Sequence, residues 1–252
     1  MSDCSLVPRA TADPADARTI YATDGAVIVE GIGPSPRDAQ SVVRSLFGAS
    51  IVALPEPAAV EAGGEKDRSD LGSADPLPLH SDGFAYGDQA GDVLALVCVA
   101  AGDTGGQSVL VDGLALYESL DPDLRRFLAE VAVDLSEPGM RPAVATVLLT
   151  LADGRRMIRW NPFLRPAPDS ADPDADRRFL TRWSDAVEAA RISARRFTAR
   201  VGQAIVVDNF RMLHSRDPFT GSRFMWRVWA WTDEANGVPD GMLHSDSRYA
   251  AS

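Results

Sequence analysis

The sequence predicts a mainly β protein with helical decoration, arranged as one β-sandwich or jelly-roll domain. Short runs of apolar and β-branched residues recur between turns that contain glycine or proline, over most of the 252 residues. Few stretches show the apolar spacing of a helix. No shift in composition divides the chain, so residues 1–252 are expected to form a single domain.

In the N-terminal half, strands and helices are expected in alternation. The first twenty or so residues are rich in Ala, Asp and Pro and are expected to be loosely held or to form a short helix. Strands are expected at 26–32, 92–100 and 107–112. Ser35-Pro36 and Asp121-Pro122 each combine a capping side chain with a proline suited to the first helical turn, so a helix is expected after each pair.

The C-terminal half adds further strands and one long helix. Strands are expected at 131–135, 146–151, 155–160, 203–208 and 224–231, and a helix at 178–199. The long segment 55–79 holds prolines, a Gly-Gly pair and the charged run EKDRSD, and is expected to be an active-site loop. The acidic, proline-rich segment 165–177 is a possible lid loop, and residues 236–252 are expected to be a flexible tail.

Charge and composition exclude several classes of function. The net charge of −11 disfavours binding to nucleic acid, whose phosphates would be repelled. No apolar run approaches the length needed to span a membrane, and the N-terminus lacks the apolar core of a signal peptide. The chain contains two cysteines, Cys4 and Cys98, which do not indicate a disulfide framework. A reducing, cytoplasmic location is therefore expected, with a small molecule as the partner; the oligomeric state stays open.

A metal site is indicated by two of the three histidines. In His80-Ser81-Asp82, residues two apart on an extended chain point to the same face, so both side chains can reach one metal ion. His214 lies in a second apolar segment, IVVDNFRMLHSRD. Two histidines and one carboxylate on one face of a metal, with open positions opposite, form the facial triad of non-haem iron(II) oxygenases. His80, Asp82 and His214 are therefore the predicted catalytic metal ligands.

Arg227 is predicted to lie beside this metal. A hairpin centred on Thr220 and Gly221, in the turn sequence DPFTGS, sets His214 opposite Arg227 on the neighbouring strand. A guanidinium at that place is suited to binding a carboxylate through two hydrogen bonds. The alternative is that Arg227 pairs with a buried acid such as Asp208.

Three segments carry a resemblance to a known family: PLPLHSDGFAYG, TGGQSVLVDG and VGQAIVVDNFRMLHSRDPF with the following FMWRVWAW. The sequence resembles the taurine dioxygenase/clavaminate synthase-like branch of iron(II)/2-oxoglutarate oxygenases from about residue 25 to about residue 233. The resemblance implies a double-stranded β-helix, iron held by the H-x-D pair and the distal histidine, and 2-oxoglutarate and O2 as co-substrates. It also implies that Arg227 binds the distal carboxylate of 2-oxoglutarate, with Ser108 in the place of a threonine; Arg223 competes for this role or binds substrate.

The substrate is expected to be small and polar, such as an amino acid or a metabolite derived from one. Phe84 and Tyr86 are expected to line the mouth of the site, with core packing as the alternative. Arg159 and Asn161 share a strand face and are candidates for contacts with substrate, unless they are solvated or pair with the acidic loop. His244 lies in a second H-x-D triplet and is expected to belong to an exposed tail.

The leading hypothesis is hydroxylation or a related C–H oxidation. Halogenating relatives replace the carboxylate of the triad by a small residue, so Asp82 argues against halogenation. Two other hypotheses stay open: a non-catalytic jelly-roll module that binds a small molecule, and a zinc hydrolase, since two histidines and a carboxylate also suit zinc.

Overall fold

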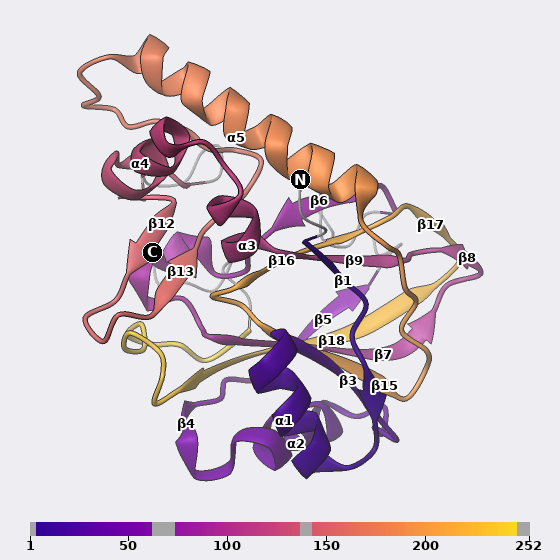
Figure 1. Cartoon of the computed structure of the whole chain (residues 1–252). Coiled ribbons are helices and arrows are strands. Elements are labelled where there is room, and N and C mark those ends of the chain that lie inside the picture. Colours follow the sequence, from indigo (N-terminus) through magenta and orange to yellow (C-terminus); the bar gives the residue numbers. More distant parts are fainter. Residues whose placement is uncertain (1–3, 62–73, 137–142, 246–252) are drawn as a thin grey trace.

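Two β-sheets packed face to face form the centre of the protein in the computed structural model, which describes residues 4–61, 74–136 and 143–245 (Figure 1). The smaller sheet is antiparallel and has the order β1 (Ser5–Leu6), β9 (Ser108–Asp112), β16 (Met212–Arg216), β6 (Leu77–His80). The larger sheet has the order β2 (Ala10–Thr11), β3 (Ala26–Glu30), β15 (Gln203–Asp208), β7 (Val93–Ala101), β18 (Arg223–Thr232), β4 (Ile51–Ala53), and β5 (Ala58–Glu61) also pairs with β18. The predicted mainly β architecture is confirmed.

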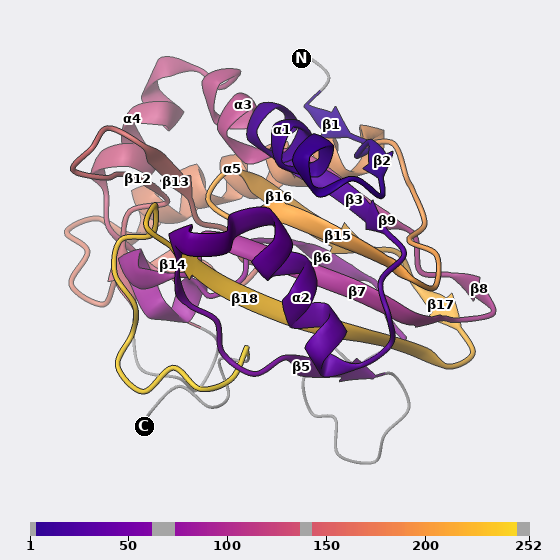
Figure 2. The ribbon, with the colours of Figure 1, turned by 90° about the horizontal axis from the view of Figure 1, so that it is seen from below.

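The helices cover the outer faces of the two sheets. The helical segments are α1 (Pro14–Asp24), α2 (Pro36–Phe47), α3 (Gly113–Glu118), α4 (Pro122–Glu130), α5 (Pro173–Ser193), and the 3-10 turns η1 (Gly48–Ser50) and η2 (Phe84–Gln89). Helices α1 and α2 lie on the larger sheet (Figure 2), whereas α3, α4 and α5 lie beside the smaller one. The short strands are β8 (Thr104–Gly105), β10 (Val133–Asp134), β11 (Val144–Ala145), β12 (Leu148–Thr150), β13 (Arg156–Ile158), β14 (Arg165–Pro166) and β17 (Phe219–Thr220).

Burial on both faces explains why the central strands are almost continuously apolar. In β3, Ile28 points into the layer between the sheets, where it packs with Leu110 and Met212 of the smaller sheet. Its neighbours Val27 and Val29 point the other way and pack under α1 and α2. Since successive strand residues face opposite sides, a sheet covered on both sides needs apolar residues at every position.

The two helix starts that the sequence predicts are confirmed. The Ser35 hydroxyl accepts a hydrogen bond from the main-chain N–H of Asp38, whose carboxylate accepts one from the N–H of Ser35. The carboxylate of Asp121 accepts from the N–H of Leu124 at the start of α4. Such caps satisfy N–H groups that have no partner inside the helix.

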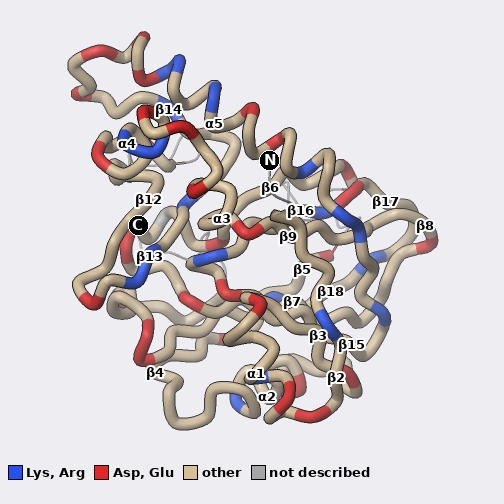
Figure 3. Tube along the Cα trace, in the orientation of Figure 1, with Lys and Arg blue, Asp and Glu red and all other residues tan. Residues whose placement is uncertain are grey.

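Both predicted ends of the long helix, at residues 178 and 199, are wrong. Helix α5 begins at Pro173, where the Asp172 side chain caps the N–H of Ala175, and ends at Ser193. Residues 173–177 of the predicted lid loop are thus its first turn, and 165–166 are strand β14. The acidic residues of that turn suit the positive end of the helix dipole. Figure 3 shows acidic and basic positions interspersed along α5.

Several predicted loops and strands have other bounds in the structure. The expected strands at 131–135, 146–151 and 155–160 shorten to β10, β12 and β13. The expected loop 55–79 contains β5 and part of β6; its residues 62–73 lie outside the described residues. Of the expected tail, residues 236–245 include the fully buried Ser245, and residues 246–252 lie outside the described residues.

The predicted hairpin between His214 and Arg227 does not form. Strands β16 and β18 belong to different sheets, and the Cα partners of Arg227 are Leu96 and Ala58. Between β16 and β18 in the sequence, β17 pairs with β8, and the chain passes from the smaller sheet to the larger one. The crossing brings the carbonyl of Pro218 so close to Gly105, which has a φ of +74°, that a side chain there would clash. No helix in the described part of the chain is long and apolar enough to cross a membrane.

A half-buried acid lines a cavity of about 220 Å³ at one end of the larger sheet. Asp208, at the end of β15, shares this cavity with Tyr21 and Asp92. Its Oδ1 accepts hydrogen bonds from the main-chain N–H groups of Phe210 and Arg211. Burial raises the pKa of the Asp208 carboxyl to about 7.

We expect Asp208→Asn to stabilise the protein at pH 8 and to have little effect at pH 4. The pKa of Asp208 in the folded protein lies above the unfolded value of about 3.9, so the folded protein binds this proton more tightly than the unfolded chain does. The stability that the bound proton contributes is lost as the pH rises from about 4 to 7. Asparagine keeps the acceptor oxygen without the charge. Urea unfolding at both pH values should give a gain of at least about 1 kcal/mol at pH 8. An equal effect at both pH values would contradict the raised pKa.

Candidate metal centre

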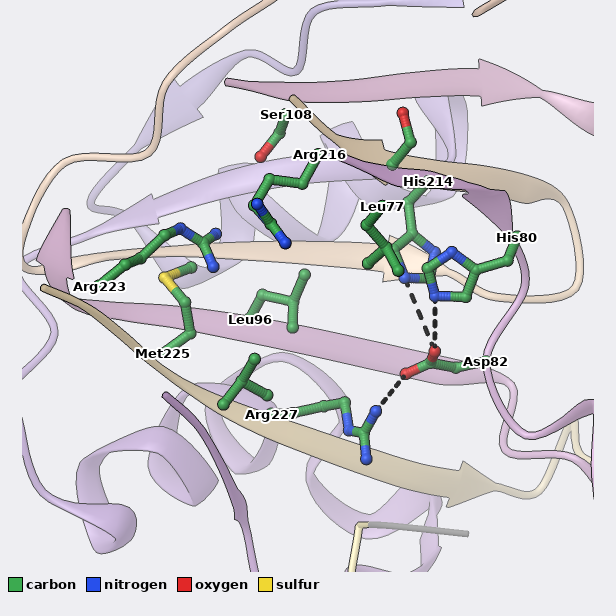
Figure 4. A pocket seen from close by; sticks show the side chains of 12 residues that line it. Leu77, His80, Asp82, Leu96, Ser108, His214, Arg216, Arg223, Met225 and Arg227 are labelled. Carbon is green, nitrogen blue, oxygen red and sulfur yellow. Dashed lines mark ion pairs between the residues drawn. The ribbon is translucent and has the colours of Figure 1, made fainter. Parts of the chain in front are cut away.

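His80 and His214 face each other from neighbouring strands of the smaller sheet. They are direct Cα partners between β6 and β16, and their ring centroids are 4.1 Å apart. Asp82 follows the end of β6 and turns its carboxylate toward both rings (Figure 4). Its Oδ1 lies 3.3 Å from Nε2 of His80 and 3.7 Å from Nε2 of His214, and all three residues are buried.

The protonation of the three side chains suits metal binding. Nδ1 of His80 lies 3.0 Å from the carbonyl of Pro78. Since a carbonyl only accepts, this contact favours the tautomer that carries its proton on Nδ1 and keeps the Nε2 lone pair for a metal. Burial, reinforced by His80, lowers the pKa of His214 to about 3. Burial would raise the pKa of Asp82, but Arg227 and the two histidines outweigh it and hold that pKa well below its ordinary value.

The donor set fits a divalent metal ion. One ligand atom from each residue can be chosen so that all lie within 4.8 Å of one another. Nε2 of His80 is buried without a hydrogen-bond partner in the described structure, although buried polar atoms nearly always have one. Ligand atoms in adjacent positions around a metal with bonds of about 2.1 Å lie about 3 Å apart, close to the separation of His80 and Asp82.

A pocket extends from the three ligands between the two sheets. Its apolar wall is formed by Val60, Leu77, Leu96 and Met225. Three arginines also line it, Arg216, Arg223 and Arg227, against the single carboxylate of Asp82. Three guanidinium groups against one lining carboxylate give the pocket a positive charge that suits an anion.

Arg227 lies beside the ligands, as the sequence predicted, although for a different reason. It projects from the opposite sheet, and its Nη1 is 3.8 Å from Oδ2 of Asp82. Its Nε donates a hydrogen bond of 2.9 Å to the carbonyl of Ser245, and its guanidinium lies over the ring of Trp229. The Arg227 guanidinium therefore already contacts a carboxylate, a main-chain carbonyl and an aromatic ring of the protein.

Arg223, Arg216 and Ser108 gather at the end of the pocket away from the ligands (Figure 4). Within the described residues the guanidinium of Arg223 has neither a hydrogen-bond acceptor nor a carboxylate partner, and its charged contact is with the ring of Phe219. Burial lowers the pKa of Arg223, and burial together with Arg223 lowers that of Arg216 to about 10. An anion placed here would relieve both effects.

The four residues considered for substrate contacts lie outside the lining of this pocket. Phe84 and Tyr86 are on η2, where the Tyr86 ring meets Trp229 edge-on. Arg159 donates to the carbonyl of Thr146 rather than to the acidic segment. The side chain of Asn161 donates to the carbonyl of Leu135 and accepts from the N–H of Phe163, so these two bonds use both ends of its amide.

Three residues that the sequence did not single out support Asp82. Asn209 accepts from the main-chain N–H of Asp82 and donates to its carbonyl, at 3.0 and 2.9 Å. The indole N–H of Trp229 donates to Oδ2 of Asp82 at 2.8 Å. Ser245 holds Arg227 and Trp229. A polar residue within the apolar run VVDNF was the available signal for Asn209; Ser245 carried none.

Comparison with known proteins matches residues 6–229 to the family described as taurine catabolism dioxygenase TauD, TfdA family. A gamma-butyrobetaine dioxygenase from Pseudomonas sp. (strain AK-1) is 32% identical over 152 residues, which cover 57% of this chain and 39% of that protein. A trimethyllysine dioxygenase from Meyerozyma guilliermondii is 28% identical over 163 residues, covering 59% and 40%. The matches thus span about two fifths of these relatives.

Solved structures show the same fold. An asparagine oxygenase in complex with Fe(II), 2S,3S-3-hydroxyasparagine and succinate superposes with a TM-score of 0.65. The superposition covers 88% of this chain and 78% of that one, at 18% sequence identity. The expected double-stranded β-helix is therefore confirmed.

Proposed function

The chain belongs to the taurine catabolism dioxygenase TauD, TfdA family, and we propose that it is an iron(II)- and 2-oxoglutarate-dependent oxygenase that oxidises a C–H bond of a small polar substrate. His80, Asp82 and His214 would hold the iron. Iron(II) bound there, together with 2-oxoglutarate, supplies O2 activation and the oxidant for C–H cleavage. The observation that carries the proposal is the buried triad opening into a pocket lined by three arginines.

We assign the distal carboxylate of 2-oxoglutarate to Arg223, with Ser108 and Arg216 beside it. Arg223 lacks a carboxylate partner among the described residues, whereas Arg227 already contacts Asp82 and Ser245. The hairpin register that favoured Arg227 is also absent. Arg223 would neutralise the anion, the Ser108 hydroxyl would donate to it, and the apolar pocket wall would exclude water from the chain between the two acid groups.

An anaerobic titration tests the proposal directly. Adding iron(II) and then 2-oxoglutarate to the apoprotein should produce the weak visible charge-transfer band of the chelate. Zinc(II) with 2-oxoglutarate serves as the control and gives no such band. A protein that binds zinc but neither iron(II) nor 2-oxoglutarate would support the hydrolase instead. A chelate without succinate release on addition of O2, with or without candidate substrates, would support the non-catalytic module.

We propose an amino acid or a metabolite derived from one as the substrate. The names of the matched relatives support this class, since gamma-butyrobetaine, trimethyllysine and asparagine each carry a carboxylate and an amino or quaternary ammonium group. The test is succinate release in the presence of a panel of amino acids, betaines and taurine. A substrate from this panel should raise succinate release above the uncoupled rate, and a response limited to long-chain alkyl compounds would contradict the proposal.

We expect oxygenation to persist unchanged in excess chloride or bromide. Two histidines, Asp82 and a co-substrate that binds through two atoms fill five of the six positions of an octahedral metal, which leaves no site for a halide beside O2. Mass spectrometry of the product checks this result. A halogenated main product would contradict the role of Asp82 as a ligand.

A further inference from the structure

The two carboxylate oxygens of Asp82 lie in different surroundings. Oδ1 faces the Nε2 atoms of His80 and His214. Oδ2 points away from them and accepts the 2.8 Å hydrogen bond from the indole N–H of Trp229, with Arg227 at 3.8 Å. Asp82 and Trp229 are both buried, so water does not compete for this bond.

We infer that Trp229 is a positioning residue that limits Asp82 to coordination through one oxygen, an inference that rests on the proposed function. A free carboxylate can bind a metal through both oxygens and would then fill the position that O2 needs. An indole N–H can only donate, so it keeps Oδ2 turned away from the metal. Hydrogen bonds to the outer side of a ligand orient it and tune metal affinity in this way.

The surrounding contacts hold the indole in place. The Trp229 ring meets Tyr86 and Trp231 edge-on, with centroids 6.0 and 6.4 Å away. Its main-chain N–H donates to the hydroxyl of Ser245, which is fully buried. The indole is thus fixed by packing on its edges and by a hydrogen bond at its backbone.

Asp82 is also fixed from its other side. The Asn209 side chain forms two hydrogen bonds with the backbone of Asp82 and a third with the carbonyl of Gly91. The backbone of Asp82 therefore cannot follow if the carboxylate rotates. The rotation of the carboxylate then depends on the contacts of Oδ2, and the indole N–H donates a hydrogen bond to this oxygen.

The test compares Trp229→Phe with Trp231→Phe. Both tryptophans are buried on β18, and Trp231 donates its indole N–H to the carbonyl of Gln89 at 2.8 Å. Each variant therefore loses one indole hydrogen bond and keeps an aromatic ring at its position, but only Trp229→Phe removes a hydrogen bond to Asp82. Metal affinity is measured anaerobically with iron(II), and coordination from the absorption of the cobalt(II) protein and from the charge-transfer band with 2-oxoglutarate.

We expect Trp229→Phe to bind iron(II) about 10- to 100-fold more weakly and to shift the charge-transfer band, with Trp231→Phe close to the parent protein. Parental affinity and spectra in a folded Trp229→Phe would overturn the inference. Should circular dichroism show that this variant is unfolded, Ser245→Ala decides, since it frees the backbone of Trp229 and should shift the band in the same direction; a parental band would overturn the inference. Failure of the parent protein itself to form the chelate would instead count against the proposed function.

Discussion

Replacing His214 with alanine is expected to abolish turnover and to weaken iron(II) binding by more than about 100-fold. Loss of a group that merely orients a metal ligand typically costs about 10- to 100-fold in affinity, and loss of the ligand itself should cost more. His80→Ala should behave alike, because the two rings face each other across one site. Anaerobic iron titration and succinate release are the measurements.

His244→Ala is the matched control, since His244 is the third histidine of the chain and is exposed near its C-terminus. We expect this variant to keep the parental affinity and rate. Full activity of His214→Ala or His80→Ala would contradict the ligand assignment. Loss of activity in all three variants would indicate general damage to the protein rather than loss of a ligand.

Replacing Arg223 with alanine is expected to raise the half-saturating concentration of 2-oxoglutarate about tenfold or more. A hydrogen bond between charged groups contributes about 1.5–3 kcal/mol, and each 1.4 kcal/mol corresponds to about a factor of ten. Ser108→Ala should have a smaller effect, because a neutral hydrogen bond contributes about 1 kcal/mol. The charge-transfer band, titrated with 2-oxoglutarate at saturating iron, measures both.

Arg227→Ala provides the comparison. Because Arg227 contacts Asp82 and Ser245, its loss should weaken iron binding more than it weakens the response to 2-oxoglutarate. If Arg227→Ala raises the half-saturating concentration of 2-oxoglutarate more than Arg223→Ala does, the distal carboxylate is bound by Arg227 instead. Arg223→Lys keeps the charge without the planar fork and should lie between the parent protein and Arg223→Ala.

Local sequence patterns predicted the elements that depend on interactions between residues close together in the sequence. The cap at Ser35 and the apolar strands β7 and β15 were found close to their predicted places. The start of α5 was missed because Asp172 and Pro173 lie in a segment whose acidic, proline-rich composition resembles a loop. The capping hydrogen bond of Asp172 and the packing of α5 make the end of that segment the first turn of the helix.

The candidate ligands were predictable for a related reason. His80 is the last residue of β6 and Asp82 follows two positions later, so the chain itself brings them together. The positions of Arg223 and Arg227 depend instead on which strands pair. The sequence around Gly221 is compatible with a hairpin between β16 and β18. In the structure β17 pairs with β8 instead, and the chain passes from the smaller sheet to the larger one.

The sequence by itself determined the strand-rich class, the family resemblance and the residue types able to bind a metal, because these depend on side-chain chemistry and on neighbours along the chain. Only the tertiary structure decided that His214 opposes His80 rather than Arg227, that Arg223 lines the pocket without a carboxylate partner among the described residues, and that Trp229 and Ser245 support Asp82. These contacts join residues that are at least 16 positions apart in the sequence. Their formation depends on how two sheets close on one another, which no local pattern specifies.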